Sequence, residues 1–271
     1  MKSRRRRLAL GLLFFLVLAL ILPGCITRIL LYPGAVRGAA SVPPPGWEEI
    51  PGGTWHLPTS SNKAPVLLLC HGNGETLGTA AAANTLDAFR RMGCPLVALE
   101  YPGFGGKQGI PSEATLLSAG DDALAWIAER YPERPVVVCG WSLGAGVAVQ
   151  SAARHPEQVK GLIALSPFTT LADAAETRYP RWLVWLLLRD RYDSLGASAR
   201  IRCPALVVHG RLDKVIPVGQ GKRIAEALSA RWIEVPGSGH DDLLYRSLDG
   251  IADFLQGCGC FESVRTETHP R

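Results

Sequence analysis

The stretch "VVVCGWSLGAGVAV", residues 136–149, joins an apolar run typical of a strand to a run of small residues typical of a helix. Ser142 lies at the junction, with Gly140 and Gly144 two residues to either side. In a sharp strand-to-helix turn, glycines are required where the backbone is crowded, and the serine hydroxyl is left exposed above the sheet. A Gly-x-Ser-x-Gly pattern alone also fits an ordinary turn, but this one stands in the required context. We therefore predict that Ser142 is a nucleophile.

The rest of the chain alternates short apolar runs with longer helical patterns. Several of the apolar runs are continuous, as expected for strands whose two faces are both covered by helices. The sequence therefore predicts an α/β domain over residues 46–257, with a mostly parallel central sheet flanked by helices. Strands are expected in "WEEI" and "TWHL" and at 64–70, 94–101, 134–140, 159–166, 203–210 and 230–237, and helices at 78–92, 112–131, 143–154, 217–230 and 241–256.

One segment interrupts this alternation, at about residues 167–200. It is too long for a plain connection between elements, and we expect it to form a short helical cap inserted over the strand ends. Its Trp182 and Trp185, with the neighbouring leucines, fit three roles. They line an acyl pocket, face lipid, or pack the cap onto the body. Packing is the favoured interpretation, because apolar stripes are usually core.

A nucleophilic serine needs a base and a group that orients the base. Asp213, in "VVHGRLDKVIP", and His240, in "VPGSGH", each follow a predicted strand. The carboxyl ends of parallel strands meet at one edge of a sheet, so we expect both side chains near Ser142. The order Ser142, Asp213, His240 is the order in which a sheet of this type delivers such a triad. Asp241 and Asp242 are closer to His240 in sequence, but they are expected to cap the last helix.

The same chemistry needs two backbone N–H groups to stabilise an oxyanion. One is expected from Leu143, the residue after the nucleophile. The other is expected from Asn73, in the loop "HGNG" after the first central strand, where Gly72 and Gly74 leave its amide free to point inward. His71 is interpreted as a brace for this loop.

The sequence predicts no metal and no cofactor. No paired Cys or His pattern of a zinc site occurs. His209, at the end of its predicted strand, is interpreted as packing or as a hydrogen-bond partner.

The N-terminus has the pattern of a secretory leader. Residues 1–24 combine a basic head, an apolar stretch over about residues 8–22 and a small-residue site before Cys25. "LPGC" looks like the lipobox of bacterial lipoproteins, which implies lipidation of Cys25. An uncleaved anchor helix is the alternative. Both readings predict an exported domain tethered to the membrane of the cell envelope, with residues 25–45 as the tether and 258–271 as a tail.

The charge of the chain gives no reason to expect nucleic-acid binding. The formal net charge is +5, and Lys2 and the four arginines at positions 4–7 supply five positive charges. The remainder is therefore close to neutral, without a basic stripe.

The cysteines leave the disulfide pairing open, although export permits disulfides. Cys70 and Cys139 lie in apolar runs and are interpreted as small buried hydrophobes. The other cysteines after the leader are Cys94, Cys203, Cys258 and Cys260.

Residues 46–257 resemble the α/β-hydrolase superfamily through "HGNG", "GWSLG", "GRLDKVIP" and "GSGH", which occur in that order. "LEYPGFGGKQGIPSE" and "LSPFTTLADAAETRYP" are similar to a membrane-tethered branch close to serine-aminopeptidase-like and acyl-protein-thioesterase-like hydrolases. The resemblance implies hydrolysis of esters, thioesters or amides without a cofactor. Two positions depart from it. Glu100 stands where many relatives carry Asp, and "GGKQG" at 105–109 replaces a Gly-x-Ser pattern.

The predicted function is that of a serine hydrolase that cleaves an ester or thioester, or an amide, of a small-molecule or lipid acyl substrate through an acyl-enzyme. Two alternatives stay open, namely an acyltransferase that uses the same triad and a non-catalytic scaffold of the envelope. A peptidase usually needs a carboxylate pair to hold an N-terminal amine, and the sequence offers no clear one. The acyl length and the oligomeric state are also left open.

Overall fold

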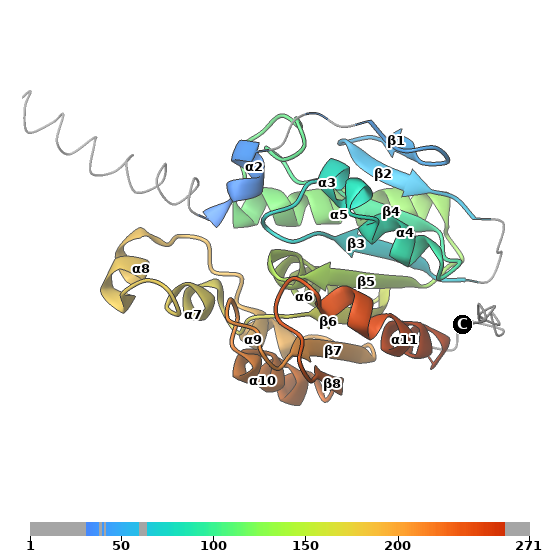
Figure 1. Cartoon of the computed structure of the whole chain (residues 1–271). Coiled ribbons are helices and arrows are strands. Elements are labelled where there is room, and N and C mark those ends of the chain that lie inside the picture. Colours follow the sequence, from blue (N-terminus) through green and yellow to red (C-terminus); the bar gives the residue numbers. More distant parts are fainter. Residues whose placement is uncertain (1–30, 38–39, 41, 60–63, 258–271) are drawn as a thin grey trace, which may run out of the picture.

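The computed structural model describes residues 31–37, 40, 42–59 and 64–257. Its centre is an eight-stranded sheet with the order β1-β2-β4-β3-β5-β6-β7-β8 (Figure 1). The first two strands pair antiparallel and β2 pairs antiparallel with β4, whereas every later pairing is parallel. The strands are β1 Glu48–Ile50, β2 Thr54–Leu57, β3 Val66–Cys70, β4 Leu96–Leu99, β5 Val136–Trp141, β6 Val159–Leu165, β7 Ala205–Gly210 and β8 Arg231–Val235.

The central strands are buried on both faces, which explains their continuous apolar runs. Every residue of β3, β4 and β7 is buried. Burial of both faces requires a layer of helices on each side of the sheet. The prediction of an α/β-hydrolase fold with a mostly parallel sheet is therefore confirmed.

Helices cover both faces of the sheet (Figure 1). Apolar side chains of α5 (Glu113–Arg130) and α6 (Leu143–Arg154) pack in one core cluster, and α10 (Val218–Leu228) lies on the same side as α6. On the other side, α3 (Leu77–Ala82), α4 (Thr85–Arg90) and α11 (Leu243–Leu255) bury their side chains in a second cluster.

The single helix expected at 78–92 is two helices instead. Asn84 adopts the left-handed conformation, with φ 59°, between α3 and α4. Asparagine enters this region more easily than other non-glycine residues, because its short polar side chain bonds locally. Apolar periodicity does not reveal such a break, so the sequence pattern predicted one continuous helix.

The predicted insertion contains three short helices, α7 (Leu171–Ala175), α8 (Arg181–Leu187) and α9 (Ser194–Ser198). Only the first two project as a cap, because α9 packs on α6 and α10. The expectation that the cap tryptophans pack onto the body is wrong. Trp182 is 67% exposed and Trp185 is 81% exposed.

The chain packs against the domain earlier than the sequence predicted. Tyr32, expected in the tether, is fully buried, and a short helix α2 spans Pro33–Arg37. The predicted leader and its Cys25 lie outside the described residues. Among the residues that are described, no helix is both long and apolar enough to cross a bilayer.

Candidate active site

Ser142 occupies the sharp turn between β5 and α6. Its φ of 56° and ψ of −115° are a strained conformation for a non-glycine residue, held in part by a hydrogen bond from its N–H to the Leu165 carbonyl of 2.9 Å. The flanking glycines are required by close backbone contacts. A Cβ on Gly140 would lie 2.0 Å from the Gly144 carbonyl oxygen, and a Cβ on Gly144 would lie 2.0 Å from the Cys70 carbonyl oxygen. The strand-to-helix turn therefore has the crowded geometry that the sequence predicted for its two glycines.

Asp213 lies in the loop between β7 and α10, and its side chain is fully buried. Oδ1 accepts hydrogen bonds from the N–H groups of Val215 and Ile216, both at 2.8 Å. Oδ2 accepts one from the Ser166 hydroxyl at 2.9 Å and lies 2.7 Å from Nδ1 of His240. These contacts hold the carboxylate in one orientation, aimed at His240.

His209 is a further neighbour of this carboxylate. Its buried Nε2 lies 2.9 Å from the Ile216 carbonyl oxygen, to which it donates, and 3.4 Å from Oδ2 of Asp213. Burial alone would raise the pKa of Asp213, but the hydrogen bonds from His209 and His240 outweigh it and hold that pKa well below its usual range. Asp213 is therefore ionised throughout the neutral range.

Ser166 is a contact that the sequence analysis missed. It lies at the end of β6, is fully buried and has a positive φ of 44°. Its hydroxyl donates to Asp213 from a strand that is neighbour to β7 in the sheet. The signal in the sequence was a serine directly after an apolar strand, in "IALSP".

His240 stands in the loop between β8 and α11, and Asp242 holds that loop. The Asp242 carboxylate accepts hydrogen bonds from the Ser238 hydroxyl at 2.9 Å and from the Gly239 N–H at 2.7 Å. Asp242 is the N-cap residue of α11, as expected from its place at the start of the helix, but its side chain makes no cap hydrogen bond. Asp241 is exposed beside His240, and Asp213 is the carboxylate that contacts the imidazole.

His71 braces the loop after β3, as predicted. Its buried Nε2 lies 2.9 Å from Oε1 of Glu100, and Oε2 of Glu100 accepts from the Leu77 N–H at 2.9 Å. Burial alone would lower the pKa of His71, but the hydrogen bond and charge of Glu100 raise it above the usual value. The longer Glu100 side chain fits because a glycine stands beside it. A Cβ on Gly105 would lie 2.2 Å from the Glu100 carboxylate.

Asn73 of this loop is held by the segment that follows the predicted leader. Its side-chain amide donates to the Leu31 carbonyl, and its own carbonyl accepts from the Gly34 N–H at 3.0 Å. Within the described residues, no protein atom accepts a hydrogen bond from the main-chain N–H of Asn73 or of Leu143. Both amides are therefore available to a ligand.

Four of the five residues expected in the site line one pocket, and Asp213 lies behind His240. Ser142, His240, Asn73 and Leu143 all border this pocket, with a volume of about 550 Å³. That volume lies within the range of sites for small molecules. Apolar side chains make up much of the remaining lining, some of them from the cap segment, and the charged residues are one arginine and two carboxylates, Arg178, Glu75 and Asp241.

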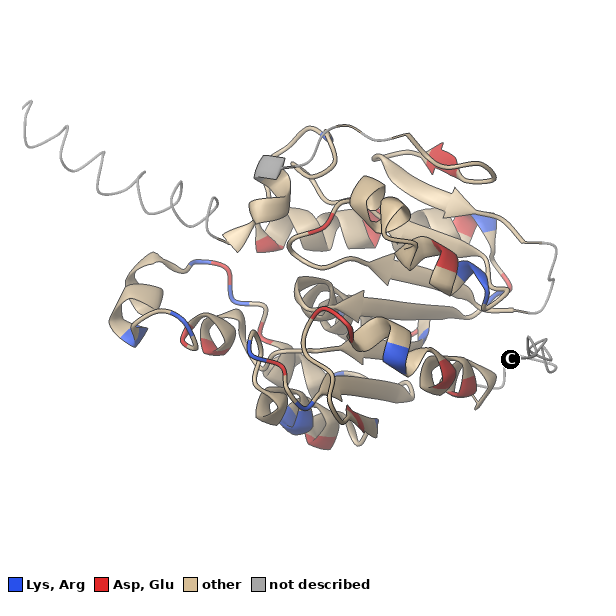
Figure 2. Ribbon diagram, viewed as in Figure 1, with Lys and Arg blue, Asp and Glu red and all other residues tan. Residues whose placement is uncertain are grey.

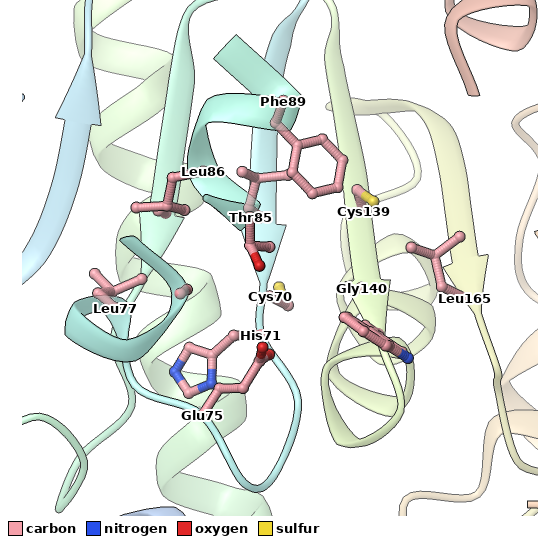
Figure 3. Close-up of a pocket in the computed structure, with 14 residues that line it drawn as sticks. Cys70, His71, Glu75, Leu77, Thr85, Leu86, Phe89, Cys139, Gly140 and Leu165 are labelled. Atoms are coloured by element: carbon pink, nitrogen blue, oxygen red, sulfur yellow. The ribbon is translucent and has the colours of Figure 1, made fainter. Parts of the chain in front are cut away.

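A separate apolar cavity lies beside the strand ends, between β3, β5 and α4 (Figure 3). The side chains of Cys70, Cys139, Leu86 and Phe89 border it, and the nucleophile does not. Burial raises the pKa of the Cys70 thiol to about 12 and raises that of Cys139 further. These two thiols are small buried hydrophobes, as the sequence predicted. No disulfide joins Cys70, Cys139 or Cys203 within the described residues.

The two strand cysteines are expected to resist alkylation. Iodoacetamide reacts with the thiolate, and a raised pKa leaves almost none at pH 8. In the folded protein at pH 8, Cys70 and Cys139 should stay unmodified, whereas both should be labelled completely in guanidinium chloride. Peptide mass spectrometry measures the fraction labelled. Equal labelling of Cys70 in the folded and unfolded protein would contradict its burial.

Comparison with known proteins gives the family. The family described as serine aminopeptidase, S33, matches residues 61–194. An uncharacterized protein of Mycobacterium tuberculosis is 32% identical over 247 residues, which are 83% of this chain and 86% of that protein. The lysophosphatidylserine lipase ABHD12 of Xenopus tropicalis is 31% identical over 233 residues, 76% of this chain and 59% of the lipase.

Solved structures share the fold. The esterase PF2001 of Pyrococcus furiosus superposes with a TM-score of 0.67 at 15% identity, covering 82% of this chain and 96% of the esterase. A monoacylglycerol lipase of Paleococcus ferrophilus superposes with a TM-score of 0.54 at 18% identity, covering 72% of this chain and 96% of the lipase.

An eight-stranded sheet with a serine at a strained strand-to-helix turn defines the α/β-hydrolase superfamily. Within that superfamily, the chain belongs to the serine aminopeptidase S33 family. A lysophosphatidylserine lipase is among its relatives in sequence, and a solved esterase and a solved lipase share its fold.

Proposed function

We propose that this protein is a serine hydrolase that cleaves carboxylic esters or thioesters of lipids, with Ser142, His240 and Asp213 as its catalytic triad. The observation that carries the proposal is the 2.7 Å contact between His240 Nδ1 and the buried Asp213 carboxylate, at the wall of the pocket that Ser142 also borders. A carboxylate on Nδ1 leaves Nε2 of the imidazole unprotonated, which is the form that accepts a proton from serine.

The proposed reaction runs through an acyl-enzyme. Ser142 Oγ attacks the acyl carbonyl while His240 Nε2 takes its proton, and the amides of Asn73 and Leu143 donate to the oxyanion. His240 then gives the proton to the leaving alcohol or thiol as the carbonyl re-forms. A water molecule, deprotonated by His240, attacks the acyl-enzyme, and the collapse of the second tetrahedral intermediate returns the proton to Ser142 and releases the acid.

A lipid ester is the substrate class that the pocket favours. The lining combines apolar side chains from the body and the cap with one cation, Arg178, and two carboxylates, Glu75 and Asp241. The apolar part of the wall suits an acyl chain. The relatives described as lysophosphatidylserine and monoacylglycerol lipases support this class. Thioesters stay within the proposed substrate class, because the sequence resembles acyl-protein-thioesterase-like hydrolases.

Two other functions have to be compared with the same observations. Acyl transfer needs the same triad and an alcohol in place of water, so product analysis separates it from hydrolysis. A non-catalytic scaffold has no physical need for a strained serine or for an ionised carboxylate aimed at the histidine. The triad geometry therefore favours an enzyme.

A fluorophosphonate probe tests the proposal, because it reacts only with an activated serine hydroxyl. We expect the folded protein to be labelled on Ser142 alone, as located by peptide mass spectrometry, and the heat-denatured protein to remain unlabelled. A series of p-nitrophenyl esters and acyl thioesters of increasing chain length then measures the acyl preference. Absence of labelling in a folded protein would favour the scaffold.

The contacts of Asn73 with the N-terminal segment lead to a prediction at Gly34. A Cβ there would lie 2.7 Å from the Asn73 carbonyl oxygen and 2.5 Å from the Phe104 ring. We expect Gly34→Val to push this segment away from the loop and to misplace the Asn73 amide. Loss of one oxyanion donor costs about 10²–10³ in turnover, so kcat for a short ester should fall by about that factor.

Gly219→Ala is the matched control for this substitution. Nothing lies within 4 Å of a Cβ at Gly219, which stands in α10. That variant should keep the wild-type kcat. Wild-type kcat in a folded Gly34→Val protein would show that the N-terminal segment does not position the loop.

We also propose that the domain is exported and anchored in the cell envelope through its N-terminal leader. The proposal rests on the sequence of residues 1–25, which lie outside the described residues. The mass of the N-terminal peptide from native membranes distinguishes the two modes. A diacylglyceryl-modified Cys25 indicates lipidation, and an intact leader indicates an uncleaved anchor. A mature protein that begins beyond Cys25 would contradict both.

A further inference from the structure

The cap carries a concentration of exposed apolar side chains that the proposed reaction does not use. Of the eight large apolar residues that are exposed in the described part of the chain, four fall within residues 179–186. They are Tyr179, Trp182, Trp185 and Leu186, with Trp185 81% exposed and Leu186 60% exposed. Soluble monomers rarely expose apolar side chains in such a cluster without a partner.

Helix α8 differs from an ordinary surface helix, because one of its apolar faces points to the outside of the molecule. Trp182, Trp185 and Leu186 have the i, i+3, i+4 spacing of one helix face, and all three are exposed, whereas Val184 on another face is buried. Tryptophan at such a surface is typical of the boundary between lipid and water, where its ring has an apolar environment and its N–H a polar one.

Basic residues border this apolar face. Arg178, Arg181, Arg189 and Arg191 are exposed in α8 or in the segments next to it. Figure 2 shows basic residues in the segments at both ends of α8, with acidic residues among them, and Arg181 lies 3.7 Å from the Glu176 carboxylate. Cations around an apolar helix face match an interface that carries anionic lipid head groups.

The position of Leu31 indicates which partner contacts the exposed apolar face of α8. Leu31 lines a groove together with Tyr179, Leu183 and Leu187, so the chain enters the described fold directly beside α8. The apolar leader ends at Leu22, nine residues earlier. Nine extended residues span at most about 32 Å, and the six residues from Cys25 to Leu31 span at most about 22 Å. Either form of the anchor therefore holds α8 close to the membrane.

We propose that α8 is a second membrane contact, which inserts Trp182, Trp185 and Leu186 into the interface of the bilayer that the leader occupies. Tyr179 lines both the Leu31 groove and the pocket of Ser142. A docked cap therefore places the pocket next to the bilayer, so that the acyl chain of a lipid substrate can pass from the membrane into the pocket. The docking itself does not depend on catalysis.

Tryptophan fluorescence of the full-length protein in liposomes tests this contact. The liposomes contain phosphatidylcholine with anionic phosphatidylglycerol, prepared with or without bromine atoms on the acyl chains, since bromine quenches only indoles that enter the lipid. Of the seven tryptophans in the chain, we expect Trp182 and Trp185 to account for most of the quenching. The Trp182→Phe/Trp185→Phe variant keeps the face apolar and should lose most of it. Trp126→Phe, within α5, is the matched control and should lose none.

The outcomes that overturn the proposal are equally defined. If the double variant and the wild type are quenched by brominated lipid to the same extent, α8 does not enter the bilayer. If Trp182 and Trp185 are quenched by aqueous acrylamide and not by bromine, the face is in water. If neither quencher reaches them, a second copy of the chain covers the face.

Discussion

Ser142→Ala should lower the turnover of a short ester by about 10⁶-fold, because loss of the serine nucleophile removes the covalent path altogether. The residual rate would come from the oxyanion donors and from substrate binding, which a missing hydroxyl leaves in place. Stopped assays with a p-nitrophenyl ester, together with loss of fluorophosphonate labelling, measure the effect.

The fold should tolerate this change. Ser142 is only partly buried, and its hydroxyl makes no cap hydrogen bond to α6. The melting temperature is therefore expected to stay close to that of the wild type. Ser229→Ala is a matched control, because Ser229 also has a positive φ, of 49°, but ends α10 at an exposed position. Full activity in purified Ser142→Ala protein would remove the proposed nucleophile.

The sequence placed the three proposed triad residues at one edge of the sheet because each is tied to the end of a strand. Ser142 follows β5, Asp213 follows β7 and His240 follows β8, and parallel strands bring these ends to one edge. The 2.7 Å contact between Asp213 and His240 is the outcome of that topology. The need for glycine at positions 140 and 144 could also be predicted, because the backbone crowding at Gly140 and Gly144 depends on local chain geometry.

What the sequence did not reveal depends on contacts between distant segments. Tyr32 donates to Asp190 at 2.6 Å, and the Leu31 carbonyl accepts from Asn73, across separations that no local pattern encodes. Ser166 contacts Asp213 for the same reason. The exposure of Trp185 was misjudged because an apolar stripe on a short helix looks the same whether it faces a core or a membrane.

Asp213→Asn should lower kcat by about 10⁴-fold with little change in the position of the neighbouring groups. An amide is nearly isosteric with the carboxylate, and its oxygen can still accept from the N–H groups of Val215 and Ile216. Its NH₂ group would then face Nδ1 of His240 and donate to it. The imidazole would carry its proton on Nε2 and could not take one from Ser142.

Asp241→Asn separates this explanation from a general effect of charge. Asp241 is adjacent to His240 in sequence and exposed, whereas Asp213 contacts the imidazole. We expect the Asp241 variant to lose only a small part of kcat. A large loss of kcat from Asp241→Asn together with a small loss from Asp213→Asn would show that Asp241, and not Asp213, orients the imidazole.

Stability as a function of pH gives an independent measure of the same carboxylate. The pKa of Asp213 is lower in the folded protein than the value of about 3.9 expected in the unfolded chain. Its ionised form therefore stabilises the fold fully above the unfolded pKa, and that contribution is lost as the pH falls toward the folded pKa. Urea unfolding should show wild type more stable than Asp213→Asn by a constant margin near neutral pH. The margin should shrink below about pH 4, because the wild-type carboxylate must bind a proton and the amide does not. A margin that grows in acid would mean that the buried carboxylate destabilises the fold and that its hydrogen bonds do not outweigh its desolvation.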